Sequence, residues 1–356
     1  MENADWSKWY SKKNNFDKYK EVRSDLIYGA LSQNIPHISI IIPTYNRSDI
    51  LKQAIDSAVN QKAYSDYEIL VIDNCSEVDQ ETNELMKHYT QKYSNLIYYR
   101  NEKNIGMFGN WNRSIELCRT EWLCLLHDDD MLKENYLQEV VPILDAGNKG
   151  CGILGVFHEK FDQRETENRK NFERRRNIRD RIVNACMVIR KRKPFCLKMS
   201  DMLNGISVMV CAAIYNREMT IELGGFDDAY TPNGDLVYFA KTQFYHGINI
   251  LPDNLSVYRV GMNESMKKET CFNIVVGIFK LTIAMAETLH IPEKRAEKYA
   301  VRRALVADEI MKSYSEDYNF EEVCAVLPLS KKYLGRPLQR MMLPNYKLRW
   351  AAKLLL

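Results

Sequence analysis

Residues 38–42 read Ile-Ser-Ile-Ile-Ile and are followed by Pro43, and this short apolar run is the strongest indication of the type of fold. Isoleucine favours strands, and an unbroken apolar run of this length is typical of a strand that is buried on both faces of a sheet. Pro43 suits the end of such a strand, because it has no N–H to donate to a neighbour. The next apolar residues recur every three or four positions, which predicts a helix: Leu51, Ala54, Ile55, Ala58 and Val59.

Strand and helix patterns continue to alternate beyond this first pair. Further strands are expected at 68–72, 96–99, 122–126 and 152–157, and helices at 78–93, 110–118 and 136–144. Strands separated by helices of this length indicate right-handed βαβ units. The sequence therefore predicts an α/β fold with a doubly wound, Rossmann-like and mostly parallel sheet.

The chain divides into three parts on this pattern. Residues 1–36 are polar with scattered aromatics and are expected to form a helical N-terminal extension. The α/β domain is expected over 37–265, with halves at 37–157 and 158–265, the second half holding a strand at 208–215 and a helix at 235–245. Residues 266–356 are expected to form a helical C-terminal region with a basic tail.

Composition excludes several classes of protein. The chain has 356 residues, of which 46% are hydrophobic and 27% charged, and its net charge of +3 gives no case for nucleic-acid binding. Its nine cysteines form no Cys-x-x-Cys pair and lie in apolar contexts, as expected of reduced core residues in a cytoplasmic protein. The first twenty residues do not resemble a secretory signal. The apolar stretch at 271–286 contains Lys280 and falls short of the roughly 20 residues that span a bilayer, so no transmembrane helix is expected.

Polar residues follow each of the first four predicted strands. In a doubly wound sheet the ligand binds beyond the carboxyl ends of the strands, so these residues are expected to converge there. They are Pro43, Thr44, Tyr45, Asn46 and Arg47, then Asp73 and Asn74, then Asn104 and Gly106, and finally His127, Asp128, Asp129 and Asp130.

The three adjacent carboxylates at 128–130 need a positive partner, because they repel one another at the end of an apolar strand. A divalent cation is one candidate. Lysine or arginine side chains could compensate equally well, and a solvated loop that caps the next helix is a third possibility.

These motifs, in this order, resemble those of the family 2 glycosyltransferases, which have the GT-A fold. The resemblance covers residues 38–262 and rests on five segments: 39–47, 69–74, 104–112, 126–130 and 224–235. Like bacterial capsule, O-antigen and exopolysaccharide enzymes of this family, such a protein is expected to move a sugar from a nucleotide-sugar donor to a hydroxyl of a saccharide acceptor. The first half of the domain would bind the donor and the second half the acceptor.

The resemblance also implies roles for single residues. Asp73 would hold the uracil ring of a UDP-sugar, although a turn residue is the alternative. Asp128, Asp129 and Asp130 would form the metal-binding Asp-x-Asp region for Mn²⁺ or Mg²⁺, with Asp129 central. Asp235 would be the catalytic base, although a helix N-cap is the alternative. The remaining donor contacts would come from Pro43, Thr44, Tyr45, Asn46, Arg47, Asn74, Asn104, Gly106, Asn112 and Asp128.

Three positions depart from the family pattern. Gly234 stands where a glutamate is common, no histidine follows Arg259, and His127 occupies the usual place of the first aspartate in Asp-x-Asp. The first two departures leave open a non-catalytic nucleotide-sugar binder. A nucleotidyltransferase is disfavoured, because no glycine-rich phosphate loop follows the first strand. Trp111 is either core or acceptor wall, and Arg259 either clamps the diphosphate or forms a structural ion pair.

Two basic segments suggest further partners. Residues 160–193 carry an excess of lysine and arginine, and the tail from 323 has no acidic residue. Such segments are usually solvated faces, but the tail, with Trp350 and terminal leucines, could lie on an anionic bilayer. Since the acceptors of such enzymes are often lipid-linked, peripheral attachment to the inner face of the plasma membrane is a second expectation.

Overall fold

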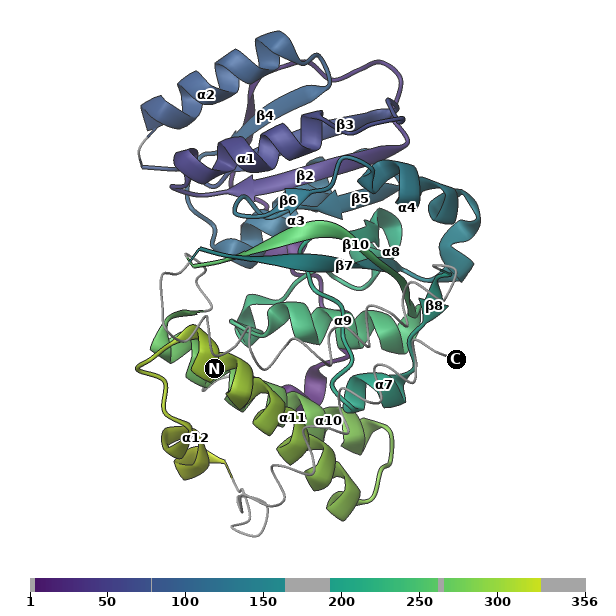
Figure 1. The fold of residues 1–356 in the computed structure, drawn as a ribbon, viewed down its shortest axis with the longest axis vertical. Coiled ribbons are helices and arrows are strands. Elements are labelled where there is room, and N and C mark those ends of the chain that lie inside the picture. The colour runs from purple at the N-terminus through teal and green to yellow at the C-terminus, as the bar shows by residue number, and fades with distance from the viewer. Residues whose placement is uncertain (1–3, 78, 164–192, 262–265, 328–356) are drawn as a thin grey trace.

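The computed structural model describes residues 4–77, 79–163, 193–261 and 266–327. Within these residues ten strands form one sheet, in the order β1-β4-β3-β2-β5-β9-β7-β10-β6, with β8 paired to β10 (Figure 1). The strands are β1 (Ser24–Tyr28), β2 (Ile38–Thr44), β3 (Tyr67–Asp73), β4 (Leu96–Asn101), β5 (Trp122–Leu125), β6 (Met131–Leu132), β7 (Ile153–Asp162), β8 (Phe195–Cys196), β9 (Ala213–Asn216) and β10 (Ile248–Val260). The fold is of the α/β class expected from the sequence.

The isoleucine run of β2 lies inside the sheet, between β3 and β5. β2 pairs in parallel with β3 on one side and with β5 on the other. Ile40 and Ile42 pack into the apolar cluster on one face, and Ile41 packs into the cluster on the opposite face. Burial on both faces explains why the strand reads as a continuous apolar run rather than an alternating one.

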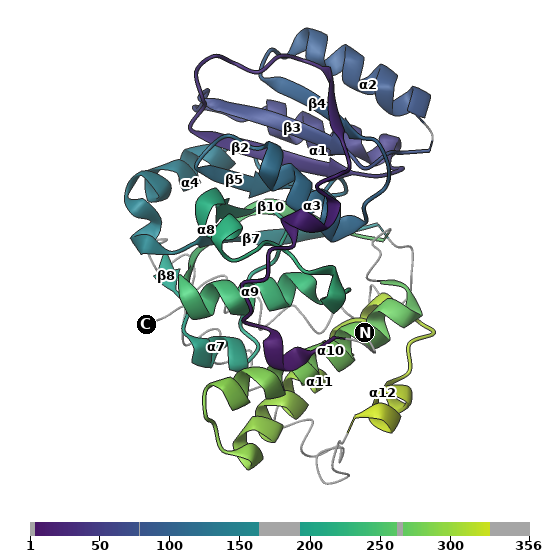
Figure 2. The ribbon, with the colours of Figure 1, turned by 180° about the vertical axis from the view of Figure 1, so that it is seen from behind.

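Helices cover both faces of the sheet. The apolar cluster on one face includes residues of α1 (Ser48–Val59), α2 (Asp79–Lys92) and α4 (Tyr136–Asp145), and the cluster on the other includes residues of α3 (Met107–Leu117) and α9 (Gly234–Tyr245). Figures 1 and 2, which show the molecule from opposite sides, place α1 in front of the sheet and α3 behind it. The remaining helices in this part are α7 (Met199–Leu203), α8 (Arg217–Glu222) and the short turns η3 (Gly147–Gly150) and η4 (Asp228–Tyr230).

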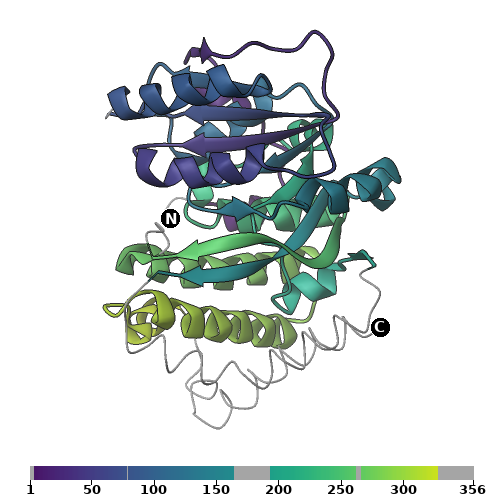
Figure 3. The ribbon, with the colours of Figure 1, turned by 45° about the horizontal axis from the view of Figure 1, so that its top comes forward.

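The sheet departs from parallel order at β9. This strand lies between β5 and β7 and runs antiparallel to both. A strand was expected at 208–215, but β9 begins only at residue 213. Residues 208–212 form an irregular segment instead, in which Cys211 lies next to Asp130. Beyond β9, β7 and β10 run side by side in parallel for most of their lengths (Figure 3).

The N-terminal extension is not the expected helical segment. It contains two short 3-10 turns, η1 (Trp6–Lys8) and η2 (Phe16–Tyr19), followed by β1. β1 pairs antiparallel with β4, so the segment completes the edge of the sheet. Figure 2 shows that the segment, in dark purple, runs from α10 past α9 to α3.

The C-terminal part of the described chain consists of α10 (Lys268–Thr288), α11 (Glu293–Tyr314) and α12 (Phe320–Val326). By length and apolarity, α10 is the one described helix that could cross a membrane, but 56% of its most apolar window is buried inside the protein. Its residues Cys271, Val275 and Phe279 share an apolar cluster with Ala300 and Val301 of α11. The basic tail and most of the basic segment 160–193 lie outside the described residues.

Candidate active site

The carboxylates after β5 lie close to the end of β2. The hydroxyl of Thr44 donates to one oxygen of Asp128 at 2.8 Å. One guanidinium nitrogen of Arg47 reaches the other oxygen of Asp128 at 3.2 Å and an oxygen of Asp129 at 2.7 Å. The structure thus brings together two of the predicted strand ends and gives Asp128 a neutralising partner within the chain.

Asp130 is held from the opposite side, by β10. The backbone N–H of Arg259 donates to Asp130 Oδ1 at 2.8 Å, and the Arg259 guanidinium donates to the carbonyl of Asp129 at 2.8 Å and to Gln53 at 2.7 Å. Arg259 is only 1% exposed. Arg259 was expected either to clamp the diphosphate or to form a structural ion pair. Its contacts favour a structural role, because they hold residues 128–130, here called the carboxylate turn, in place.

The turn remains short of positive charge in spite of these contacts. Burial raises the pKa of Asp128 to about 6, while nearby Arg47 opposes the rise. Burial and the adjacent Asp129 raise the pKa of Asp130 to about 8. Burial also lowers the pKa of His127, so its imidazole is biased toward the neutral form. A buried cluster in this state would gain stability from a bound cation.

Three of these residues form a possible metal-binding group. One ligand atom each of His127, Asp129 and Asp130 lies within 4.8 Å of the others. Among the described residues, His127 Nε2 and Asp130 Oδ2 are buried without a hydrogen-bond partner. Buried polar atoms normally have a partner, so this donor set fits the divalent ion that the sequence predicts.

Asp73, at the end of β3, has four hydrogen bonds instead. Its Oδ1 accepts from the backbone N–H of Ser76 at 3.0 Å and from the Ser76 hydroxyl at 2.6 Å. Its Oδ2 accepts from the hydroxyl of Tyr98 at 3.0 Å and from Arg100 at 3.2 Å. A direct bond to a uracil ring would have to replace one of these, and the nucleobase contact stays a prediction.

The loops after β2, β3 and β4 are tied to one another. Asn46 accepts from the N–H of Glu77 at 2.7 Å, and the Tyr45 hydroxyl donates to Glu77 at 3.3 Å. The side chain of Asn74 donates to Asn104 at 2.8 Å and to the carbonyl of Gly106 at 3.2 Å. These predicted donor contacts therefore lie together at the strand ends, with much of their polar capacity used to shape the loops.

Asn112 has a different place from the one expected. Its amide donates to the carbonyl of Phe226 at 2.8 Å and accepts from the Phe226 N–H at 2.9 Å. A Cβ at Gly225, whose φ is +68°, would lie 2.5 Å from the Asn112 side-chain oxygen. Both ends of the Asn112 amide thus hold the loop at 224–228 against α3, and the predicted donor contact of Asn112 stays a prediction.

Asp235 lies in the first turn of α9, where its Oδ1 accepts from the N–H of Leu236 at 2.8 Å. Asn233, not Asp235, is the N-cap of the helix. Burial raises the pKa of Asp235 to about 6. A carboxylate with a pKa nearer to neutrality is a better proton acceptor, so these surroundings suit a general base.

Aromatic side chains connect the two sides of the site. Trp111 of α3 stacks on His127, with ring centroids 5.1 Å apart, and packs edge-on against Phe226 at 5.2 Å. Phe226 in turn contacts Tyr238 of α9 at 4.5 Å. Trp111 is thus part of the core, and it also contacts both His127, next to the carboxylate turn, and Phe226 in the loop at 224–228. No local sequence pattern indicates that Trp111 stacks on His127, because stacking depends on tertiary packing.

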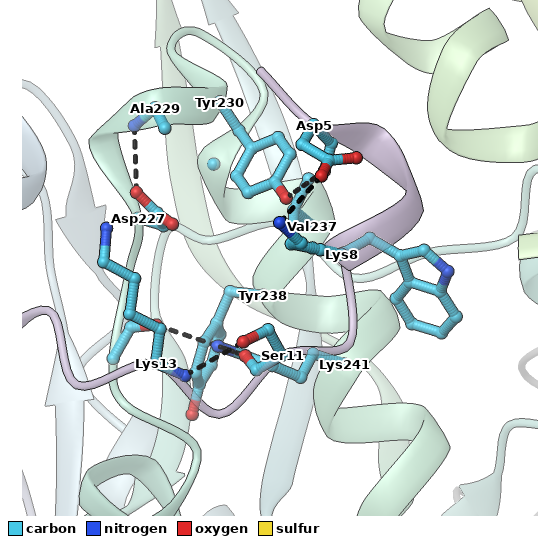
Figure 4. Close-up of a pocket in the computed structure, with 13 residues that line it drawn as sticks. Asp5, Lys8, Ser11, Lys13, Asp227, Ala229, Tyr230, Val237, Tyr238 and Lys241 are labelled. Atoms are coloured by element: carbon cyan, nitrogen blue, oxygen red, sulfur yellow. Dashed lines mark hydrogen bonds and ion pairs between the residues drawn. The ribbon is translucent and has the colours of Figure 1, made fainter. Parts of the chain in front are cut away.

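A cavity of about 270 Å³ lies next to the loop that precedes α9, and Gly225, Asp227 and Ala229 are among its lining residues. Figure 4 shows Tyr230 and Tyr238 on its wall, with Lys8 and Lys13 of the N-terminal segment opposite α9. Lys241 donates to the carbonyls of Leu223, Gly225 and Ser11, and burial lowers its pKa to about 8. No residue of the carboxylate turn is among the residues that line the cavity. Gly234, which precedes Asp235 in the chain, does line it.

Comparison with known proteins agrees with this arrangement. Residues 39–224 match the sequence profile of the family described as "Glycosyl transferase family 2", and the chain belongs to that family. It is similar to the abequosyltransferase RfbV of Salmonella typhimurium, with 32% identity over 33% of this chain and 38% of the relative. The matched region spans less than half the length of each of the first curated relatives.

Solved structures share the fold at low sequence identity. TarS of S. aureus in complex with UDP-GlcNAc has a TM-score of 0.53 at 15% identity, covering 87% of this chain and 80% of TarS. The mannosyltransferase PcManGT of Pyrobaculum calidifontis, in complex with GDP-Man and Mn²⁺, has a TM-score of 0.50 at 14% identity, covering 96% of this chain and 92% of PcManGT. These likenesses establish the GT-A fold of the chain.

Proposed function

We propose that this protein is a metal-dependent, inverting glycosyltransferase that moves a sugar from a nucleoside diphosphate sugar, a UDP-sugar, to a hydroxyl of a saccharide acceptor. One observation carries the proposal. The ligand atoms of His127, Asp129 and Asp130 converge at the carboxyl end of β5, beside the end of β2. The family of the chain and the nucleotide-sugars bound by two proteins of the same fold support this assignment.

The donor diphosphate would lie over the carboxylate turn. A bound Mn²⁺ or Mg²⁺ would neutralise the diphosphate as the glycosidic bond breaks. Asp129 and Asp130 have the oxygen donors that such ions prefer, and Asp128 lies next to them. Arg47 already bridges Asp128 and Asp129, and its cation is placed to orient the anionic donor.

Asp235 would act on the acceptor. Its raised pKa, about 6, lets it take the proton of the acceptor hydroxyl near neutral pH. The oxygen would then attack the anomeric carbon from the face opposite the departing diphosphate, which inverts the configuration. Asn112 holds the loop that precedes Asp235, and Trp111 connects that loop to the carboxylate turn.

The nucleoside would lie against the loops after β3 and β4. Asp73 and Asn74 hold these loops in shape through Ser76, Arg100 and Asn104. Because the carboxylate of Asp73 has four bonds already, backbone groups of the loops are better placed to contact the base than Asp73 itself.

A thermal-shift panel tests the donor assignment. UDP-, GDP-, ADP-, CDP- and dTDP-sugars would be compared with and without Mn²⁺, because a ligand that binds only the folded state raises the melting temperature. We expect the largest shift with a UDP-sugar, and only when Mn²⁺ is present. A larger shift with a GDP-sugar would change the donor assignment, and no shift with any donor would contradict a nucleotide-sugar site.

Turnover separates the enzyme from a non-catalytic binder. The enzyme releases UDP from its donor when an acceptor is supplied, whereas a binder protects the donor without releasing UDP. Asp235→Asn should stop the release and leave the Mn²⁺-dependent thermal shift unchanged. If wild type releases no UDP with any acceptor fraction and Asp235→Asn behaves identically, the binder is the better description.

We further propose a lipid-linked acceptor at the cytoplasmic face of the membrane, with a role in surface polysaccharide synthesis. The support is the family resemblance and the basic, acid-free sequence from 323 to 356, most of which lies outside the described residues. Sedimentation with vesicles of anionic and of neutral lipid tests the attachment. Binding to anionic vesicles that is lost on removal of residues 331–356 is expected. Equal recovery in the supernatant with both lipids would contradict it.

A further inference from the structure

His127 occupies a position where the family usually has an aspartate, and the structure gives this difference a chemical meaning. Its imidazole lies within 4.8 Å of carboxylate oxygens of Asp129 and Asp130. Asp128, in contrast, is not a member of this group. The set that converges is therefore one nitrogen donor and two carboxylates, rather than three carboxylates.

The two outer members of the set have buried atoms without hydrogen-bond partners among the described residues. The Asp130 side chain is 0% exposed. Its Oδ1 accepts from the N–H of Arg259, its Oδ2 has no hydrogen-bond partner among the described residues, and the thiol of Cys211 is a further polar neighbour of the carboxyl. His127 Nε2 is likewise unsatisfied, and Nδ1 lies 3.6 Å from Asp130 Oδ2, too far for a good hydrogen bond. An unpaired buried polar atom destabilises the folded protein, and a bound ion would remove that cost.

The imidazole is also held in place. Trp111 stacks on the His127 ring at 5.1 Å with an interplanar angle of 26°, and Trp111 itself is buried between Phe108 and Phe226. A ring held in this way keeps its nitrogens at the carboxylate side without a large loss of entropy on binding. The His127 side chain is 21% exposed, although its Nε2 is buried.

Asp128 is used differently. One of its oxygens accepts from Thr44 and the other accepts from Arg47. Both oxygens therefore have partners that position the end of β2, and metal coordination by Asp128 would have to break one of these contacts.

We propose that the divalent cation is bound by an imidazole nitrogen of His127 together with Asp129 and Asp130, and that Asp128 is a positioning residue for Thr44 and Arg47. This inference rests on the proposed function, since it concerns the same metal. Imidazole favours Mn²⁺, Co²⁺ and Zn²⁺ over Mg²⁺, which prefers oxygen ligands. His127 thus makes the site selective against Mg²⁺, and aspartate at this position would relax the selectivity.

Pulsed electron paramagnetic resonance of bound Mn²⁺ tests the nitrogen ligand directly, with the metal alone and with UDP added. Wild type should show nitrogen hyperfine coupling that changes when the protein carries isotopically labelled histidine, a comparison that needs no substitution. His127→Gln should lose the coupling and weaken Mn²⁺ binding by about 10–100-fold. The exposed His88→Gln on α2 is the matched control and should leave both unchanged.

Metal preference gives the second measurement. The ratio of Mn²⁺ to Mg²⁺ affinity should fall about tenfold in His127→Asp, which restores the usual family residue, while Asp128→Asn should keep Mn²⁺ affinity within about threefold. Circular dichroism establishes that each variant is folded.

The outcomes separate the inference from the proposed function. Mn²⁺ bound to wild type without histidine-dependent nitrogen coupling, but with phosphorus coupling from UDP, would overturn the histidine ligand and leave the glycosyltransferase site standing. An unchanged metal preference in a folded His127→Asp protein would also overturn it. If neither Mn²⁺ nor UDP binds wild type, the proposed function fails and the inference fails with it.

Discussion

Asp73 and Asp130 are both buried carboxylates near the carboxyl ends of strands that flank β2, yet their surroundings differ. Asp73, at the end of β3, accepts four hydrogen bonds, one of them from the cation of Arg100. Asp130, in the turn after β5, accepts from the N–H of Arg259 at one oxygen, and its other oxygen has no hydrogen-bond donor among the described residues.

This difference separates a structural carboxylate from one that, under the proposed function, would bind a metal ion. The bonds to Asp73 fix the loops that follow β3 and β4. Burial and Asp129 instead raise the pKa of Asp130 to about 8, so its charged form is disfavoured until a cation arrives. The same residue type at neighbouring strand ends therefore serves two purposes, and each can be tested separately.

Removal of the central carboxylate of the turn should have the largest effect. Asp129→Asn is expected to lower kcat/KM by about a thousandfold, equivalent to about 4 kcal/mol, because it removes a metal ligand. UDP release assays with Mn²⁺ measure this. Asp66→Asn, in an exposed loop before β3, is the matched control and should keep wild-type activity. Substantial metal-dependent turnover in Asp129→Asn would contradict the metal site.

Asp235, which is partly exposed, adds a third carboxylate to the comparison. Asp235→Asn should lower kcat by about 10²–10³-fold, because the base is lost. In wild type, kcat/KM should fall about tenfold for each pH unit below its pKa of about 6 and level off above it, because only the deprotonated base works. A profile of kcat/KM against pH checks this. A flat profile between pH values of about 5 and 7 would exclude Asp235 as the base.

The same pKa gives a stability prediction with a definite sign. Since folding raises the pKa of Asp235 from about 4 to about 6, wild type loses stability as the pH rises through this window. Asp235→Asn does not titrate there. The variant should therefore gain stability relative to wild type at high pH and not at low pH, as thermal melts at both pH values would measure.

Neutral substitutions should lower the free energy of unfolding by unequal amounts at the two compared positions. Asp73→Asn is expected to lower the free energy of unfolding by about 3 kcal/mol, because it breaks a buried ion pair with Arg100. Asp130→Asn should cost little without metal, because it keeps the bond from Arg259 and removes the repulsion by Asp129. Urea unfolding of metal-free protein measures both. Equal losses in the free energy of unfolding at the two positions would contradict the difference proposed between Asp73 and Asp130.

The smallest effect is expected at the contact between the two strand ends. Thr44→Val removes the hydroxyl that donates to Asp128, at a cost of about 1 kcal/mol. We expect the KM for the donor to rise about fivefold with kcat nearly unchanged, because the turn loses a positioning contact but no metal ligand. Steady-state kinetics decide this, and a large fall in kcat would assign Thr44 a more direct role.

Much of the fold could be predicted from the sequence because the relevant signals are local. The isoleucine run of β2 and the stripe of α1 are buried by neighbouring elements, and their periodicity reports that burial directly. β1 and β9 were harder to predict. Whether a short segment pairs antiparallel with β4, or enters between β5 and β7, depends on partners far away in the chain.

The site shows the same limit. The strand-end positions of Thr44, Asp73 and Asp129 followed from the βα pattern, since parallel strands place their carboxyl ends on one edge. The partners of Asp73 and of Asn112 did not, because they are side-chain bonds across elements, set by packing. Sequence therefore located the polar residues, and the structure separated those that shape loops from those with unused ligand atoms.

Calorimetric titration of UDP in the presence and absence of Mn²⁺ tests whether the carboxylate turn is a metal site for the nucleotide donor. If the carboxylate turn holds a cation that contacts the diphosphate, Mn²⁺ and UDP must strengthen each other's binding reciprocally. We predict that Mn²⁺ tightens UDP binding at least about tenfold in wild type, that EDTA reverses this, and that Asp129→Asn abolishes it. The same UDP affinity with and without Mn²⁺ in wild type would contradict a cation that links the carboxylate turn to the diphosphate.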